Sequence, residues 1–294
     1  MASEHIGAIE IGLVGLGRMG SAIAGRLLEC GYALRVYDQD AHAIERVVQR
    51  GARAAATPAD TAQAGGIVIS SVTDAAGVDA ICAGEGGLLR TLRGGTHIGM
   101  STLSPQAAAD LARRHEEAGV RYVSAPVQGR PAAAGTGQLV GWVSGPRDAQ
   151  AQAVLEALCR KVFWLSEDAA AGPATKLAIN FLMFGNVALM AEAFAYVERH
   201  GIAQQAFAEG LTDTVFAAPF FRNFAAALCA QEQAAQGSDI ALAHKDFKLL
   251  VGSEPHPELL PSAHRMHEIY QRAMDEGLAE LDPAAVRRLF ARPA

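Results

Sequence analysis

The first half of the chain alternates short apolar runs with segments patterned as amphipathic helices. This alternation is the signature of βαβ units, which close into a parallel sheet with helices on its faces. We predict strands at 9–14, 34–37, 67–72, 96–98, 121–123 and 139–143, and a last one at 162–165. The predicted helices between them span 19–30, 41–49, 76–82, 105–118 and 149–158.

The second half of the chain lacks this alternation of strand and helix patterns. Residues 173–200 form one helical pattern that ends at Gly201, and only helices are predicted after it. Apolar residues surround this long helix almost completely, so it must be buried on most sides, and a subunit interface is one way to cover what a small domain leaves open. We therefore predict an α/β N-terminal Rossmann domain (1–166), then an all-α C-terminal domain (167–294) built around a long interdomain helix.

Composition and charge exclude several classes of function. The 25 Lys and Arg residues are outnumbered by 31 Asp and Glu, whereas nucleic-acid binding needs a positive excess along one face. The four cysteines lie too far apart for a C-x-x-C, zinc or disulfide pattern, which favours a reducing compartment. No signal peptide is visible, and the most apolar run, 177–191, is shorter than the ~20 residues of a membrane span. We predict a cytoplasmic protein without nucleic-acid or membrane partners.

A glycine motif follows the first predicted strand directly. Gly15, Gly17 and Gly20 form G-x-G-x-x-G between a strand and a helix, which is the context that this motif requires. The first glycine permits a tight turn, the second lets the backbone approach a pyrophosphate, and the third allows close packing of the helix. The helix N-terminus adds N–H donors and a positive dipole. The pattern predicts a dinucleotide site.

An acidic residue ends the second predicted strand, about 20 residues beyond the glycines, as the fingerprint requires. Asp38 can accept hydrogen bonds from the adenine ribose, and its charge favours the 2′-hydroxyl of NAD over the 2′-phosphate of NADP. No arginine follows immediately to reverse that preference. Asp40 suits the N-cap of the next helix, so we assign Asp38 to the ribose and Asp40 to the cap.

Two polar residues open the long helix. Lys176 and Asn180 are four residues apart and share one helix face. A lysine can give a proton to a carbonyl oxygen as hydride reaches the carbon, and an amide can hold the substrate or orient the lysine. From spacing alone, a lysine that extends its amine from a helix end into solvent is the alternative.

Taken together, four blocks resemble the β-hydroxyacid dehydrogenase superfamily, which includes 3-hydroxyisobutyrate dehydrogenase and tartronate semialdehyde reductase. They are the glycine motif with its Met19-Gly20 ending, the loop 124–130, the stretch Gly172-Pro-Ala-Thr-Lys176-Leu-Ala-Ile-Asn180, and His244-Lys245-Asp246. The blocks occur in the family's order and cover nearly the whole chain. The resemblance implies an NAD(P)-dependent oxidoreductase that interconverts a short β-hydroxy acid and its semialdehyde or oxo acid.

The resemblance also implies roles for individual residues. Lys176 and Asn180 are the catalytic pair, with the lysine as general acid/base and the amide on the substrate. The cofactor, NAD by preference or else NADP, is expected along Gly15, Leu16, Gly17, Arg18, Met19, Gly20, Asp38, Val72, Thr73, Thr102 and Lys245. The carboxylate substrate is expected at Ser101, Gln128, Gly129 and Arg130. Members commonly assemble as homodimers or homotetramers.

The chain departs from the family's A-P-V-S-G-G loop where specificity is decided. Gln128 replaces the serine, and Arg130 replaces the second glycine. Arg130 can clamp a carboxylate with two hydrogen bonds or pair with a surface acid, and both readings stay open. These departures concern recognition of the substrate and leave the residues implied in the reaction itself unchanged.

Two other functions are compatible with part of this sequence. An imine reductase shares the architecture, although such enzymes typically carry another residue in place of Lys176. A cofactor-binding module without catalysis would have no need to keep both Lys176 and Asn180. The histidines at 256, 264 and 267 have no accompanying carboxylate cluster, so we predict no metal site.

Overall fold

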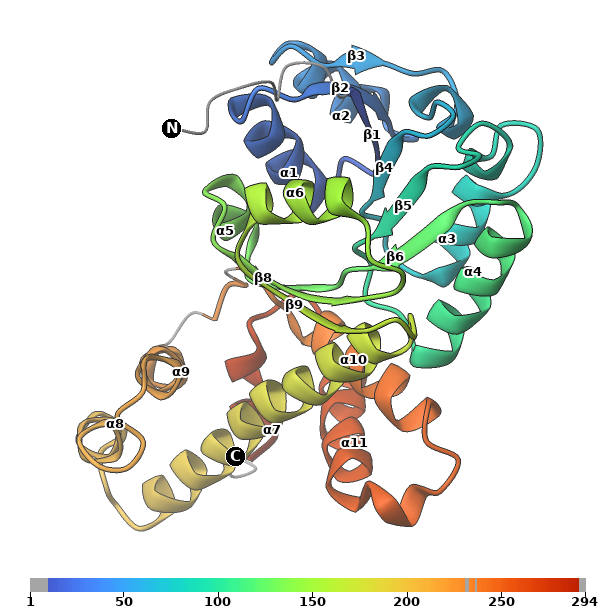
Figure 1. Cartoon of the computed structure of the whole chain (residues 1–294). Coiled ribbons are helices and arrows are strands. Elements are labelled where there is room, and N and C mark those ends of the chain that lie inside the picture. The colour runs from blue at the N-terminus through green and yellow to red at the C-terminus, as the bar shows by residue number, and fades with distance from the viewer. Residues whose placement is uncertain (1–9, 231–232, 236, 291–294) are drawn as a thin grey trace. The chain divides into compact units, whose positions relative to one another are not determined.

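The computed structural model describes residues 10–230, 233–235 and 237–290 (Figure 1). Contacts divide the chain into two compact units, and the division falls after Lys176. This position lies inside a long helix, past the domain boundary predicted at residue 166.

The first unit is built on a mixed, mostly parallel sheet. Its strands are β1 (Glu10–Val14), β2 (Ala33–Tyr37), β3 (Arg53–Ala54), β4 (Ile67–Ser70), β5 (Thr96–Gly99), β6 (Arg121–Ser124), β7 (Val127–Gln128), β8 (Leu139–Ser144) and β9 (Cys159–Ser166). The spatial order is β3-β2-β1-β4-β5-β6-β8-β7, with β9 beside β8. Strands β1 to β6 are parallel, whereas β8 runs antiparallel to both β6 and β7. The strand order reverses between β1 and β4, which is where Rossmann folds bind ligands.

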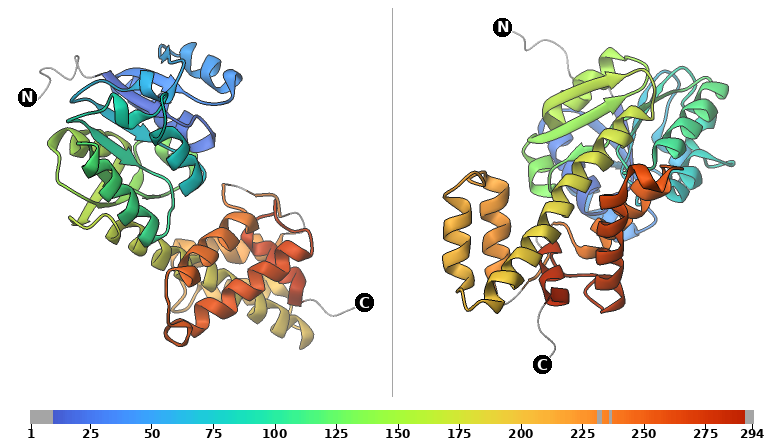
Figure 2. Two further views of the ribbon diagram at one scale, coloured as in Figure 1. Left: turned by 90° about the vertical axis from the view of Figure 1, so that its right-hand side faces the viewer. Right: turned by 90° about the horizontal axis from the view of Figure 1, so that it is seen from below.

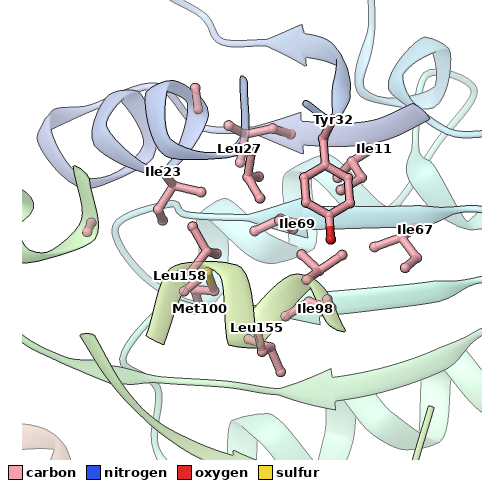
Figure 3. Close-up of a cluster of buried hydrophobic side chains, with 14 of the residues drawn as sticks. Ile11, Ile23, Leu27, Tyr32, Ile67, Ile69, Ile98, Met100, Leu155 and Leu158 are labelled. Carbon is pink, nitrogen blue, oxygen red and sulfur yellow. The ribbon is translucent and has the colours of Figure 1, made fainter. Parts of the chain in front are cut away.

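Helices cover both faces of this sheet. They are α1 (Arg18–Glu29), α2 (Ala41–Val48), α3 (Ala75–Cys82), α4 (Pro105–Glu117), α5 (Pro131–Gly135) and α6 (Ala149–Leu158), with short 3-10 turns at η1 (Pro58–Thr61) and η2 (Leu88–Arg90). Successive side chains of β4 point to opposite faces, so Ile67 and Ile69 enter one core while Val68 enters the other. Figure 3 shows the first core, where Leu27 of α1 and Leu155 of α6 gather over the sheet.

The second unit is helical in the part that the structure describes, apart from one bridge between Ala234 and Leu281. Its elements are most of α7 (Ala171–Arg199), then α8 (Gln204–Thr212), α9 (Pro219–Cys229), α10 (Ile240–Gly252), η3 (Pro257–Leu259), α11 (Pro261–Asp275) and η4 (Pro283–Phe290). Within this unit α8 lies beside α9, and α10 beside α11 (Figure 2). Large aromatic residues fill its core, among them Phe184, Phe194, Phe247 and Tyr270.

Helix α7 is long and apolar enough to span a membrane by length and composition alone. Half of its most apolar window is buried inside the protein, and Phe184, Val187 and Ala191 belong to the core of the second unit. These contacts are those of a central helix in a globular domain, which passes the same test of length and composition. We therefore interpret α7 as a core helix.

The predicted fold class is confirmed. Elements β3, β7 and α5 were not predicted, because two to five residues are too few to show a periodicity. The sheet was predicted to be parallel, whereas β8 runs antiparallel to its neighbours β6 and β7.

Asp148 connects three elements of the first unit. Its side chain caps α6 by accepting a hydrogen bond from the Ala151 amide at 2.8 Å. The same carboxylate accepts bonds from Thr96 Oγ1 on β5 at 2.8 Å and from Arg121 Nε on β6 at 3.1 Å. Burial alone would raise the pKa of Asp148, but these hydrogen bonds and the Arg121 charge outweigh burial and lower it.

We expect Asp148→Asn to destabilise the first unit by about 1 kcal/mol at pH 7, because asparagine can still cap α6 but loses the charge that pairs with Arg121. Because the folded pKa is below the unfolded value of ~3.9, the charge stabilises fully above that value and stops stabilising as pH falls through the folded pKa. The difference in unfolding free energy between variant and wild type should therefore shrink below about pH 4. Urea unfolding can be followed by Trp142 and Trp164, both in this unit. The control is Asp110→Asn, because Asp110 is exposed. A difference in unfolding free energy that stayed constant down to low pH would contradict this role of the Asp148 charge.

Candidate active site and cofactor pocket

A pocket of about 340 Å³ opens at the carboxyl ends of β1, β2 and β4. Backbone hydrogen bonds continue the sheet just past these ends, from Gly15 N to Tyr37 O and from Ser71 N to Val14 O, both at 2.9 Å. The residues that line the pocket are Val14, Gly15, Gly17, Tyr37, Asp38, Gln39, Ser71, Val72, Thr73, Asp74, Gly77, Ala80 and Ile81. The pocket thus occupies the point where the strand order reverses.

The three glycines of the motif are required for different reasons. Gly15 has a φ of +92°, and a Cβ there would collide with the Ser71 carbonyl. A Cβ on Gly20 would collide with the Gly15 carbonyl, so this glycine lets α1 pack closely on the turn. A Cβ on Gly17 would meet no protein atom within 4 Å. Packing therefore does not explain Gly17, and the space beside its Cα is open to a bound group.

Asp38 is held at the rim of this pocket by two backbone amides. Its Oδ2 accepts from Leu16 N at 2.5 Å, and its Oδ1 accepts from Asp40 N at 2.8 Å. The carboxylate thereby joins the end of β2 to the glycine turn. Asp40 caps α2 through a bond from the His42 amide at 2.9 Å, as the sequence analysis assigned it.

Other residues predicted to bind the cofactor have varied surroundings. The Leu16 side chain is fully buried, so only its backbone belongs to the turn, and Met19 packs against the same core. Arg18 is exposed, and Thr102 is partly buried. Lys245 lies on α10 in the second unit.

Ser101 supports the pocket wall. Its hydroxyl donates to Val72 O at 2.7 Å and accepts from Val72 N at 3.2 Å, so it fixes the backbone of a residue that lines the pocket. Ser101 was predicted to contact the substrate, and its contact with Val72 was not predicted. Ser71, Asp74 and Gln39 were not predicted either, because they line the pocket only where the strand ends meet.

The start of α7 is anchored on β8. Ser144 Oγ accepts from Gly172 N at 2.8 Å and donates to Ala169 O at 2.9 Å. A Cβ on Gly172 would come within 2.5 Å of the Trp142 carbonyl oxygen, so glycine is needed for this close approach. One turn further along the helix, Lys176 is buried, and its Nζ donates to Gln128 Oε1 at 2.9 Å. The anchor thus positions the predicted catalytic lysine against the predicted substrate loop.

That loop is shaped by β7 and its pairing with β8. Gln128 is in register with Val140, which fixes its backbone. Gly129 has a φ of +134°, and a Cβ there would press on the Leu139 side chain. Arg130 is the N-cap residue of α5, is exposed, and makes no ion pair with an acid of the described chain.

In the second unit, Asn180 Nδ2 donates to Asp246 Oδ2 at 2.6 Å. Both side chains are buried, and Lys245 Nζ lies 3.8 Å from the other oxygen of Asp246. Asp246 therefore orients the predicted catalytic amide. The Lys-Asp motif contains this residue, but the sequence could not show that its partner is 66 positions away.

The chain matches known families along most of its length. Residues 10–166 match the NAD binding domain of 6-phosphogluconate dehydrogenase, and residues 170–290 match the NAD-binding domain of NADP-dependent 3-hydroxyisobutyrate dehydrogenase. The chain belongs to the β-hydroxyacid dehydrogenase superfamily. It is thus an NAD(P)-dependent dehydrogenase of the class that acts on CH–OH groups.

Individual relatives agree with this assignment. The uncharacterized oxidoreductase YfjR of Bacillus subtilis is 33% identical over 95% of this chain and 98% of its own length. The NAD-dependent L-serine dehydrogenase of Pseudomonas aeruginosa is 29% identical over 96% of this chain and 97% of its own. The structure of Mycobacterium tuberculosis 3-hydroxyisobutyrate dehydrogenase with L-serine has the same fold, with a TM-score of 0.84, 23% identity, and coverage of 97% of this chain and 99% of that one.

The residues of this dehydrogenase fit a dinucleotide. Helix α1 begins at Gly17 without a side-chain cap, so its first amides can meet a pyrophosphate. The empty space beside the Gly17 Cα and the Asp38 carboxylate at the rim suit the phosphate and ribose ends of such a group.

We expect Gly17→Ala to weaken NADH binding by roughly tenfold or more, which corresponds to about 1.4 kcal/mol, because the methyl group occupies space that no protein atom fills. The free energy of unfolding of the Gly17→Ala variant should differ from that of the wild type by less than about 1 kcal/mol. The control is Gly20→Ala, whose methyl group collides with the Gly15 carbonyl, so it should lose both stability and binding. Fluorescence titration and urea unfolding separate the two effects, and wild-type affinity in Gly17→Ala would refute the assignment.

Proposed function

We propose that this dehydrogenase interconverts a short β-hydroxy acid and its semialdehyde or oxo acid, with Lys176 as the general acid/base. The observation that carries the proposal is the position of Lys176, which is buried near the start of α7 with its amine on the neutral carbonyl of Gln128. The bound cofactor supplies or accepts the hydride.

A neutral partner suits a group that must change its protonation state. The carbonyl of Gln128 accepts a hydrogen bond from either a protonated or a neutral amine, so this bond can hold Nζ in both protonation states. A carboxylate in the same place would favour the protonated form. Lys176 can then donate a proton to the substrate oxygen during reduction and accept it during oxidation.

The loop around Gln128 supports recognition of a carboxylate. Arg130 is exposed without an acidic partner in the described chain, which favours the carboxylate clamp over the surface ion pair. Gly129 has no side chain, so the backbone that follows Gln128 is accessible. Asn180, oriented by Asp246, is the proposed second contact to the substrate.

We further propose a preference for NAD over NADP. Asp38 and Asp74 are the charged residues that line the pocket, and none of its lining residues is Lys or Arg. A 2′-phosphate there would face negative charge without a compensating cation. The proposed compartment is the cytoplasm, in keeping with four cysteines that are all free thiols.

We expect Lys176→Ala to lower kcat by about 10²–10⁴-fold while NADH still binds with near wild-type affinity. Lys176→Arg should lose activity too, since a guanidinium keeps the charge but does not release its proton. The assay follows oxidation of NADH and of NADPH with succinic, methylmalonic and tartronic semialdehydes, glyoxylate and a cyclic imine.

The matched control is Lys161→Ala, which removes the same charge from an exposed position on β9. Full activity in Lys176→Ala would reject the acid/base role. Turnover of the cyclic imine alone would reject the substrate class and leave the hydride transfer itself in place.

We also propose that the chain forms a homodimer or homotetramer through α7. Leu182, Leu189 and Tyr196 lie seven residues apart, so they form one stripe along the helix, and each is more than half exposed. Contiguous apolar surface of this kind marks an interaction site in soluble proteins.

We expect the double variant Leu182→Glu/Leu189→Glu to be monomeric, because a dimer would bury both charges without partners. The oligomeric state is measured by size-exclusion chromatography with light scattering. The control, Leu259→Glu, changes an equally exposed leucine on η3 outside the stripe. An unchanged assembly in the double variant, or a monomeric wild type, would reject this interface.

A further inference from the structure

Three buried side chains meet inside the first unit, on the face of the sheet covered by α3 and α4 (Figure 1). Cys82 ends α3, His97 lies on β5, and His115 lies in the last turn of α4. His97 Nδ1 is 2.8 Å from His115 Nε2, and Cys82 Sγ lies 3.9 Å and 3.8 Å from these same two nitrogens. One sulfur and two nitrogens therefore face a common point.

The outer hydrogen bonds fix which nitrogens face that point. His115 Nδ1 lies 2.7 Å from the Leu111 carbonyl, which only accepts, so this nitrogen carries the proton and His115 Nε2 offers a lone pair. His97 Nδ1 then donates to that lone pair, and His97 Nε2 accepts from Ser70 Oγ at 2.8 Å. Burial lowers the pKa of His115 to about 4 and raises that of Cys82 to about 12, so the cluster is neutral as it stands.

We propose that Cys82, His97 and His115 form a binding site for one thiophilic d¹⁰ metal ion, preferably a monovalent one such as Cu⁺. The donor set of one thiolate and two imidazoles is typical of copper and zinc sites. Metal–ligand bonds of about 2.0–2.3 Å place such donors about 3.3–3.7 Å apart, so the two nitrogens must separate by about half an ångström or more while the sulfur approaches them by a few tenths of an ångström.

The outer contacts also resemble those of metal-bound histidines. Such residues usually donate their remote N–H to a carbonyl or another oxygen, which holds the ring in place. His115 already does so with Leu111 O. If His97 moves its proton from Nδ1 to Nε2, it donates to Ser70 Oγ and presents Nδ1 to the metal. The thiol proton of Cys82 leaves to solvent, and the sulfur–metal bond takes its place.

The surroundings favour a monovalent ion. Cys82 is 2% exposed, and both histidines are 0% exposed. The ring of Tyr122 closes the group, with its centroid 4.8 Å from that of His115 and 5.5 Å from that of His97. The neighbouring carboxylate of Asp79 is already bonded to Arg114. A thiolate with Cu⁺ stays neutral in this core, whereas Zn²⁺ would leave a buried positive charge.

The site is separate from the cofactor pocket, and none of its three ligands lines that pocket. Its ligands come from α3, β5 and α4, so a bound ion would cross-link one face of the sheet. The expected consequence is stabilisation of the first unit, since a ligand that binds only the folded state raises its stability.

The test uses the full chain with Cys30→Ser and Cys229→Ser, because these two partly exposed thiols would bind Cu⁺ without a built site. Copper binding is measured without oxygen, in competition with a chromophoric Cu⁺ chelator. Cys82→Ser is compared with Cys159→Ser, which removes an equally buried thiol that belongs to no such donor group in the described chain. X-ray absorption of the copper-loaded background protein reads the ligands directly and needs no mutation in the cluster.

We expect one copper per chain, coordinated by one sulfur and two nitrogens, in the background protein. Cys159→Ser should match it, and Cys82→Ser should bind at least roughly 100-fold more weakly, since even outer partners of a metal contribute about 10–100-fold. No retained copper, equal binding by Cys82→Ser, or coordination without nitrogen would overturn the site. Tighter binding of Zn²⁺ than of Cu⁺ would overturn the argument from charge.

Discussion

The handedness of the βαβ crossover determines where this protein can bind a dinucleotide. Strands β2 and β3 lie on one side of β1, and β4 and the strands after it lie on the other side. Connections between parallel strands are right-handed as a rule. The loops that leave β1 and β4 therefore lead to opposite faces of the sheet, and side chains cannot close the crevice between their ends. The glycine turn, Asp38 and the segment at Val72 all face that crevice because of this topology. The strand order therefore sets the position of the pocket, and the individual residues determine its shape and charge.

Helix α7 independently positions two polar side chains of the candidate site. It carries Lys176 and Asn180 on one face, and each has a partner within its own unit, the half-buried Gln128 for the lysine and the buried Asp246 for the amide. A continuous helix is stiff over one turn, so the spacing of these two polar groups is set by covalent geometry and backbone hydrogen bonds. The two partners then fix the direction of each side chain. In the proposed mechanism, a helix therefore holds the acid/base and substrate-binding groups more firmly than a loop could.

The fold and the local half of the site could be predicted because both depend on short-range patterns. Apolar periodicity located the longer strands and helices, and the strand–glycine–helix sequence located the pocket. The long-range half could not be predicted. Gln128 and Lys176 are 48 positions apart, and no residue pattern indicates that β7 pairs with β8 beside the start of α7. For the same reason Cys82, His97 and His115 look like isolated residues in the sequence, although the packing of α3, β5 and α4 brings them together.

The contact between Gln128 and Lys176 has a consequence for specificity. In the proposed mechanism the loop after β7 selects the substrate, while α7 supplies the proton. Because Gln128 belongs to that loop and also accepts the hydrogen bond from Nζ, a change of loop sequence alters both the shape of the pocket and the position of the amine. The family's smaller serine at this position is too short to make the same contact from the same backbone register. In the proposed mechanism substrate preference and the acid/base step are therefore coupled, since a substrate that displaces Gln128 would also break its hydrogen bond to Lys176.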